Sequence, residues 1–275
     1  MRGRVGWGCL GLLLCLLAGS AAAAPHRVAS LNLCTDELLV ALADRGDIVS
    51  LSPLAHDPDL STVADVAATL PDNNKSTEEI VREGTDLVLT EADPTDVTAA
   101  LLQRLGVRVE MVDVVDRLAA VAPTVRRIAA WLGREERGEA LIAKMTATLK
   151  AIPVPQERPR AIFYEPAGWS DGPGTMKDDV LTAAGFVDQA SALGIIGYRQ
   201  LPLETVVANP PDILITETYR PEDVSLAERW ADHPALRAVK RRIALPTRFL
   251  LCGTPAVADA VAMLAAAQSP NVAAK

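Results

Sequence analysis

The sequence predicts an α/β protein with two lobes, each built on a parallel central sheet, joined by a long rigid helix. Three observations lead to this fold class. One helix–strand unit occurs twice, short apolar runs alternate with helical segments along most of the chain, and a long helix-forming segment lies between the two halves. Strands that alternate with helices form parallel sheets with right-handed crossovers.

The repeat is the strongest of these signals. Residues 78–91 read Glu-Glu-Ile-Val and end on Asp-Leu-Val-Leu-Thr-Glu, and residues 204–217 read Glu-Thr-Val-Val and end on Asp-Ile-Leu-Ile-Thr-Glu. Every match falls at one offset. Each copy is a short helix followed by a strand without polar alternation, which is typical of a parallel strand buried on both faces. The repeat therefore indicates two related lobes.

The remaining elements follow the same alternation. Acidic residues in the first turn of one helix, residues 35–43, suit the positive end of the helix dipole. Glycines end two other helices. We expect strands at 27–31, 48–51, 86–90, 107–112, 161–164 and 242–245, and helices at 35–43, 95–105 and 177–184.

Residues 115–151 consist almost entirely of good helix formers. Pro123 and Gly133 are expected to divide this segment into two helices, and the second carries apolar residues at helical spacing. Prolines at 153, 155 and 159 end it. A surface helix of a single domain is the alternative, but the repeat favours a rigid connector between two lobes.

The first residues resemble an export signal. Arg2 and Arg4 precede an apolar run over residues 9–18, and small residues lead to a cleavage site near Ala23 or Ala24. An uncleaved anchor is the alternative, but the run is shorter than the roughly 20 residues that a membrane span requires. We therefore divide the chain into a signal peptide (1–24), an N-terminal lobe (25–115), a connecting helical segment (116–152) and a C-terminal lobe (153–275).

The net charge of the exported chain limits the classes of molecule that it can bind. Removal of Arg2 and Arg4 leaves 25 of the 27 basic side chains against 35 acidic ones (25 − 35 = −10). Such a surface repels nucleic acid and anionic lipid and suits a protein that diffuses in the periplasm.

Several segments resemble the periplasmic binding proteins of iron–siderophore and vitamin B12 importers. Residues 27–39 (Arg-Val-Ala-Ser-Leu-Asn-Leu-Cys-Thr-Asp-Glu-Leu-Leu) are similar to the first strand and helix of that family. Residues 78–89 resemble its next helix–strand element, with Thr85 in place of the usual proline. Residues 172–175 (Gly-Pro-Gly-Thr) and 204–215 resemble the matching parts of the second lobe. The resemblance extends from about Arg27 to Ala267.

The resemblance implies a fold, a ligand class and a partner. The ligand, a ferric siderophore or a cobalamin-like corrinoid, is held in a cleft between the lobes, which close only modestly. The protein then delivers it as a monomer to the permease dimer of an ABC importer in the inner membrane. Glutamates at the positions of Glu78 and Glu204, one in each lobe, dock onto permease arginines. Two solvated helix glutamates are the alternative.

The cleft is expected at loops that follow the carboxyl ends of strands, where open α/β sheets bind ligands. Aromatic rings there cover a flat ligand, and arginines bind carboxylate or catecholate oxygens. Phe249 lies where the vitamin B12-binding protein of the family has a tryptophan. The candidate ligand-binding residues are Asn32, Cys34, His56, Asp57, Trp169, Tyr198, Arg199, Arg248 and Phe249.

Cys34 and Cys252 are the only cysteines that remain after export, in an oxidising compartment. They form a disulfide only if their Cα atoms approach within about 7 Å. Two buried thiols, or a thiol pair that contacts the ligand, are the alternatives.

Three other functions are alternatives to ligand delivery. A bare-metal binding protein needs several histidine and carboxylate ligands, but His26, His56 and His233 form no group with ligand spacing. An exported two-domain hydrolase-like enzyme is the second, although nucleophile-elbow, Walker and dinucleotide glycine motifs are all absent. A scaffold that has lost its ligand is the third. We expect no cofactor, no resident metal and no catalytic residues.

Overall fold

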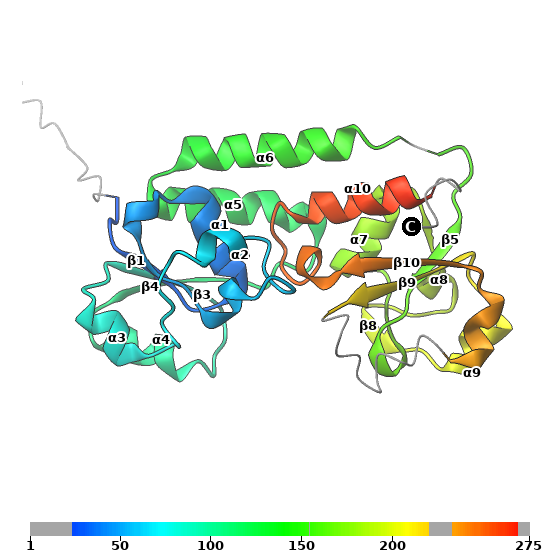
Figure 1. Cartoon of the computed structure of the whole chain (residues 1–275), viewed down its shortest axis with the longest axis horizontal. Coiled ribbons are helices and arrows are strands. Elements are labelled where there is room, and N and C mark those ends of the chain that lie inside the picture. The colour runs from blue at the N-terminus through cyan, green and yellow to red at the C-terminus, as the bar shows by residue number, and fades with distance from the viewer. Residues whose placement is uncertain (1–23, 154, 220–232, 269–275) are drawn as a thin grey trace, which may run out of the picture.

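The computed structural model describes residues 24–153, 155–219 and 233–268. The predicted signal peptide lies outside these residues except for Ala24. Two sheets lie at opposite ends of an elongated molecule, and long helices run along one side of both (Figure 1). Within the described residues, no helix has both the length and the apolar character needed to cross a membrane.

The N-terminal sheet has four parallel strands in the order β2-β1-β3-β4. Its buried strands are short apolar runs, as predicted. The strands are β1 (Val28–Ser30), β2 (Ile48–Ser50), β3 (Leu87–Glu91) and β4 (Arg108–Val112), and the helices of this lobe are α1 (Leu33–Leu42), α2 (Ala64–Ala67), α3 (Thr77–Arg82) and α4 (Val97–Arg104).

The C-terminal sheet also has four parallel strands, in the order β10-β9-β5-β7. An antiparallel pair, β6 with β8, was not predicted, because β6 and β8 have only three residues each and β8 is exposed along its whole length. The strands are β5 (Arg160–Phe163), β6 (Trp169–Asp171), β7 (Val187–Asp188), β8 (Tyr198–Gln200), β9 (Ile213–Thr218) and β10 (Arg241–Pro246), and the helices are α7 (Met176–Ala183), α8 (Gln189–Ala192) and α9 (Leu203–Ala208).

The two sheets share one topology. Read from the other edge, the second sheet is β7-β5-β9-β10, which matches β2-β1-β3-β4 strand for strand in chain order. The repeated segments form α3 with β3 and α9 with β9. In the first sheet Leu87 is paired with Val28, and in the second the equivalent Ile213 is paired with Ala161. The repeat in the sequence is therefore a repeat in the fold.

Two antiparallel helices, α5 (Leu118–Leu132) and α6 (Glu135–Lys150), connect the lobes and run along one side of them (Figure 1). Gly133 ends α5 in the left-handed conformation at φ 65°, which glycine adopts without strain. The prediction that Pro123 also breaks the helix is wrong. Proline keeps a helical φ and removes one hydrogen bond, and burial of one face of α5 outweighs that loss.

Ion pairs fix both ends of this helix pair. Arg117, before α5, bonds Asp179 of α7 at 2.7 and 2.8 Å. At the other end Arg134, before α6, bonds Asp44 and Asp47 of the N-terminal lobe at 2.8 and 2.9 Å. Helix α6 then returns to the C-terminal lobe beside α10 (Val257–Ala267) (Figure 1).

One apolar core continues through both lobes and the helices between them. Because the core is continuous, the lobes do not pack as independent units, and separating them exposes apolar surface. Its members include Leu39 and Leu89 of the first lobe, Ile128 and Met145 of α5 and α6, and Phe163, Leu245 and Val261 of the second.

Candidate ligand-binding cleft

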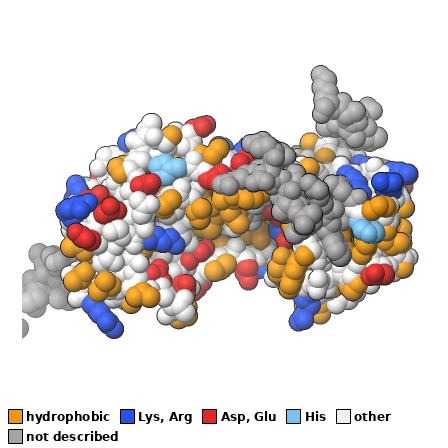
Figure 2. Space-filling view, turned by 60° about the horizontal axis from the view of Figure 1, so that its bottom comes forward, with side chains coloured by type: hydrophobic (Ala, Val, Ile, Leu, Met, Phe, Trp, Pro, Cys, Tyr) orange, Lys and Arg blue, Asp and Glu red, His pale blue; other side chains and the backbone are white. Residues whose placement is uncertain are grey.

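The carboxyl ends of strands from both sheets meet between the lobes. Strands β9 and β10 point toward the N-terminal lobe (Figure 1). The residues after β1 lie at the same junction, because Cys34 is bonded to Cys252 of the C-terminal part. Figure 2 shows the molecule hollowed between the lobes, with hydrophobic side chains inside the hollow. This is where open α/β sheets bind ligands.

A buried lysine cluster lies at the carboxyl ends of β5 and β9 in the C-terminal lobe. Lys177, in the first turn of α7, forms ion pairs with Glu165 after β5 and Glu217 of β9, and its Nζ lies 3.5 Å from Asp171 Oδ2. This cluster was not predicted. Its members are brought together by three strands and a helix, and no local motif links them.

The cluster shifts the pKa values of its members. Burial acts to lower the pKa of Lys177, but the carboxylates outweigh it and raise that pKa above its usual range. Burial, together with a hydrogen bond to Glu165, raises the pKa of Asp171 to about 7. Burial also raises the pKa of Glu217. Burial acts to raise the pKa of Glu165 as well, but Lys177 reverses the effect and the pKa is lowered.

Trp169 and Tyr198 stack on each other beside this cluster. Their ring centroids are 4.8 Å apart with 20° between the planes. Trp169 is 37% exposed and Tyr198 is 52% exposed, so ring surface remains accessible. The Tyr198 hydroxyl donates a hydrogen bond to Glu165 Oε2 at 3.0 Å, and burial followed by the charge of Glu165 raises the pKa of Tyr198 to about 12. Trp169 lies on β6 instead of the predicted loop.

The structure places the two candidate arginines differently. Arg199 is exposed on β8, and its Nε donates to the backbone oxygen of Ile196 at 3.1 Å. Arg248 crosses to the other lobe, where its Nη1 donates to the backbone oxygen of Pro58 at 3.0 Å. Its guanidinium also lies 5.0 Å from the ring centroid of Phe249. Arg248 is therefore engaged in contacts between the lobes.

The N-terminal candidates follow the first two strands. Asn32 caps α1, where its Oδ1 accepts a hydrogen bond from the Thr35 amide at 3.0 Å. His56 ends a short 3-10 helix (Pro53–His56), and its Nε2 is buried without a hydrogen-bond partner among the described residues. Asp57 accepts a hydrogen bond from the Asp59 amide at 2.9 Å.

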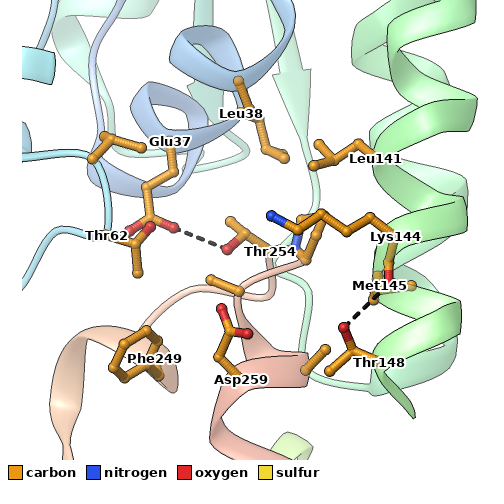
Figure 3. Close-up of a pocket in the computed structure, with 15 residues that line it drawn as sticks. Glu37, Leu38, Thr62, Leu141, Lys144, Met145, Thr148, Phe249, Thr254 and Asp259 are labelled. Carbon is orange, nitrogen blue, oxygen red and sulfur yellow. Dashed lines mark hydrogen bonds between the residues drawn. The ribbon is translucent and has the colours of Figure 1, made fainter. Parts of the chain in front are cut away.

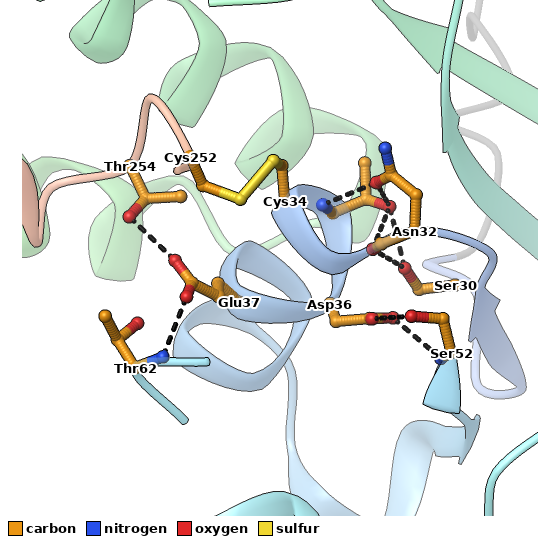
Figure 4. The surroundings of a disulfide bond; sticks show 10 residues. Ser30, Asn32, Cys34, Asp36, Glu37, Ser52, Thr62, Cys252 and Thr254 are labelled. Carbon is orange, nitrogen blue, oxygen red and sulfur yellow. Dashed lines mark hydrogen bonds between the residues drawn. A yellow bond between two sulfur atoms is a disulfide. The ribbon is translucent and has the colours of Figure 1, made fainter. Parts of the chain in front are cut away.

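A disulfide joins Cys34 to Cys252, with their Cα atoms 5.1 Å apart (Figure 4). Cys34 lies in the first turn of α1, and Cys252 precedes α10, so the bond links the two lobes. It also removes Cys34 as a thiol ligand. One turn further along α1, Glu37 accepts hydrogen bonds from Thr254 Oγ1 at 2.9 Å and the Thr62 amide at 2.8 Å.

A second cavity, of about 290 Å³, lies at the joint between α1, α6 and α10 (Figure 3). Leu38, Met145 and Phe249 contribute apolar walls, and Lys144 and Asp259 supply charges. Phe249 thus lines this junction pocket, although it was predicted to lie in the main cleft. The pocket was not predicted, because its walls come from three distant parts of the chain.

Glu78 and Glu204 occupy equivalent positions in the first turns of α3 and α9. Both are exposed. The two helices lie near opposite ends of the molecule, on the side away from α6 (Figure 1).

Comparison with known proteins agrees with this architecture. A family model described as "Periplasmic binding protein" matches residues 28–248. A comparison with curated protein sequences finds no match.

Solved structures share the fold over nearly the whole chain. The periplasmic heme-binding protein from Roseiflexus sp. RS-1 is 27% identical, with a TM-score of 0.72 over 88% of this chain and 97% of that one. An Fe³⁺-hydroxamate transport protein from Saccharomonospora viridis is 20% identical (TM-score 0.65; 90% and 94% covered). The periplasmic vitamin B12 binding protein of Vibrio cholerae is 18% identical (TM-score 0.61; 89% and 98% covered). Since the family model spans most of the sequence, the chain belongs to the periplasmic binding protein family.

Proposed function

We propose that this protein captures a chelated metal compound, a ferric siderophore or a corrinoid, and delivers it to an ABC importer. The observation that carries the proposal is the pair of sheets with one strand order, whose carboxyl ends meet at a hollow between the lobes. Similar structures are described as a heme-binding protein, an Fe³⁺-hydroxamate transport protein and a vitamin B12 binding protein, which supports a chelate as the ligand.

The cleft offers suitable contacts for such a ligand. The exposed faces of Trp169 and Tyr198 bury apolar ligand surface, and a few polar groups, among them His56 and Asp57, fix its orientation. The disulfide and the continuous core hold the lobes together, so binding requires only a small closure. Ligand binding needs no chemical step.

Delivery takes place in the periplasm after removal of residues 1–24. The protein acts there as a monomer that docks on the permease dimer. Glu78 and Glu204 are exposed at matching places on the two lobes, so each carboxylate can pair with a permease arginine.

Fluorescence titration of the mature protein tests the proposal. We expect saturable quenching by at least one class of chelate and none by the free metal ions. A Trp169→Phe variant should lose most of the quenching signal if the ligand lies against this ring. Quenching by free metal alone, or by no compound in a panel of corrinoid, hydroxamate, catecholate and heme, would contradict the proposal.

A further inference from the structure

The wall of side chains at the carboxyl ends of β5 and β9, where open α/β sheets bind ligands, carries more negative than positive charge. Lys177 is the one cation in contact with Glu165, Asp171 and Glu217 among the described residues. A single ammonium group neutralises one carboxylate. The cluster therefore keeps a negative charge from Glu165 and Glu217 whenever these are ionised, and Asp171 adds to it once it loses its proton.

Asp171 is the carboxyl group of the cluster that Lys177 compensates least. The residue is 6% exposed, and its Oδ2 lies 3.5 Å from Lys177 Nζ but accepts no hydrogen bond among the described residues. Buried polar atoms are normally satisfied, and an unsatisfied acceptor costs free energy. A donor from a bound molecule would satisfy it.

The stacked aromatic pair has the same electrostatic preference. Faces of aromatic rings carry the negative end of the ring quadrupole, which attracts cations and N–H donors. The hydrogen bond from Tyr198 to Glu165 joins this pair to the cluster, so rings and carboxylates form one surface. The nearby arginines point elsewhere, Arg199 to the backbone of Ile196 and Arg248 to that of Pro58.

We infer that this wall, formed by Glu165, Asp171, Glu217, Trp169 and Tyr198, selects chelates that present a positive charge or amide N–H groups and rejects chelates that present carboxylates or a high negative charge. The inference rests on the proposed function and narrows its ligand class. Corrinoids, with their amide side chains, and cationic ferric hydroxamates meet this requirement. Hemes, with two propionates, and ferric tricatecholates do not.

The test compares four probes under one set of conditions. Cyanocobalamin, a cationic ferric hydroxamate, hemin and a ferric tricatecholate are titrated into the mature protein at low and high salt. We expect one of the first two to bind at least about tenfold more tightly than either anionic probe. The difference should shrink at high salt, because salt screens partly exposed charges.

Two variants assign the selectivity to the wall. Glu217→Gln keeps the shape of the side chain and removes its charge, and Asp171→Asn does the same above pH 7, where Asp171 is ionised. At that pH the affinity ratio of favoured to anionic probe should fall about threefold or more in each variant. Glu136→Gln, at an exposed position of α6, is the matched control and should keep the wild-type ratio. Near-ultraviolet circular dichroism establishes that each variant is folded.

The outcomes separate this inference from the proposed function. Tight binding of hemin or the tricatecholate by the wild type, or an unchanged ratio in folded variants, overturns the charge selection and leaves chelate binding intact. Failure of all four probes to bind overturns both.

Discussion

Two adjacent carboxylic acids on α1, Asp36 and Glu37, are buried where the N-terminal lobe meets the joint. Asp36 accepts hydrogen bonds from the amide of Ser52 at 3.1 Å and from its hydroxyl. Burial outweighs these bonds and raises the pKa of Asp36 to about 7. Burial likewise raises the pKa of Glu37.

The raised pKa of Asp36 predicts a particular dependence of stability on pH. The folded state holds this proton up to about pH 7, whereas the unfolded state releases it near the ordinary value of 3.8. Its contribution to stability is therefore complete at low pH and is lost as the pH rises through 7. In Asp36→Asn this loss is absent, so the free energy of unfolding of the variant should gain on the wild type between pH 4 and 7. Urea unfolding at several pH values measures this, and parallel profiles would contradict it.

Gly253 shows how closely the lobes approach each other. A Cβ at this position would lie 2.4 Å from Cβ and the backbone oxygen of Val115. We expect Gly253→Ala to force the two segments apart and to destabilise the protein by about 1–3 kcal/mol, as overpacking does. Gly46→Ala is the control, since nothing lies within 4 Å of a Cβ there. Thermal unfolding compares the two variants, and equal melting temperatures would refute the steric argument.

At the scale of elements, α3 and α9 present the same kind of surface on the two lobes. Each is a helix of six residues with an exposed glutamate in its first turn. Acidic side chains are stabilised there by the helix dipole whether or not they dock. These glutamates therefore either dock on the permease or only stabilise the first turn of their helix. The two roles predict different effects of charge reversal on ligand delivery.

Charge reversal distinguishes the two roles. We expect Glu78→Lys and Glu204→Lys each to reduce ligand delivery to the permease at least about tenfold and to leave ligand affinity unchanged, because both residues lie outside the cleft. Transport by reconstituted importer vesicles and fluorescence titration measure the two quantities. Glu136→Lys on α6 is the control. Full transport by the double variant would exclude docking.

For the whole molecule, the disulfide is a covalent link between the lobes in addition to the chain itself. It closes a loop between residues 218 positions apart. In the chain-entropy model a loop of this length contributes roughly 5 kcal/mol to stability. The apolar core around the disulfide is continuous, so the bond stabilises an interface between the lobes that is already held by apolar packing.

Removal of both cysteines tests this contribution. Cys34→Ser with Cys252→Ser should lower the free energy of unfolding by up to about 5 kcal/mol, measured by urea unfolding. Reductant should destabilise the wild type and leave the double variant unchanged. A mass difference of two hydrogens between the oxidised and reduced wild type checks the bond itself. Stability that is equal in both proteins without reductant would show that the link is not formed.

The sequence by itself determined the fold class and the main strands and helices. Signals within one segment are sufficient for these features, because a strand buried on both faces is a continuous apolar run, and the equal spacing of 78–91 and 204–217 reveals the duplication. The resemblance to the family rests on the order of these strand and helix segments along the chain. The prediction that Pro123 ends a helix was wrong, because packing against distant residues stabilises α5 on both sides of this proline.

The contents of the cleft were decided only by the tertiary structure. The Lys177 cluster, the stacking of Trp169 on Tyr198, the pairing of Cys34 with Cys252 and the position of Phe249 in the junction pocket all join residues that are far apart in the chain. Such contacts depend on the order of the strands and on how the lobes pack. Neither property can be recognised from the residues that flank each contact in the sequence. A local pattern can therefore identify the loops around a site, but it cannot identify which side chains meet there.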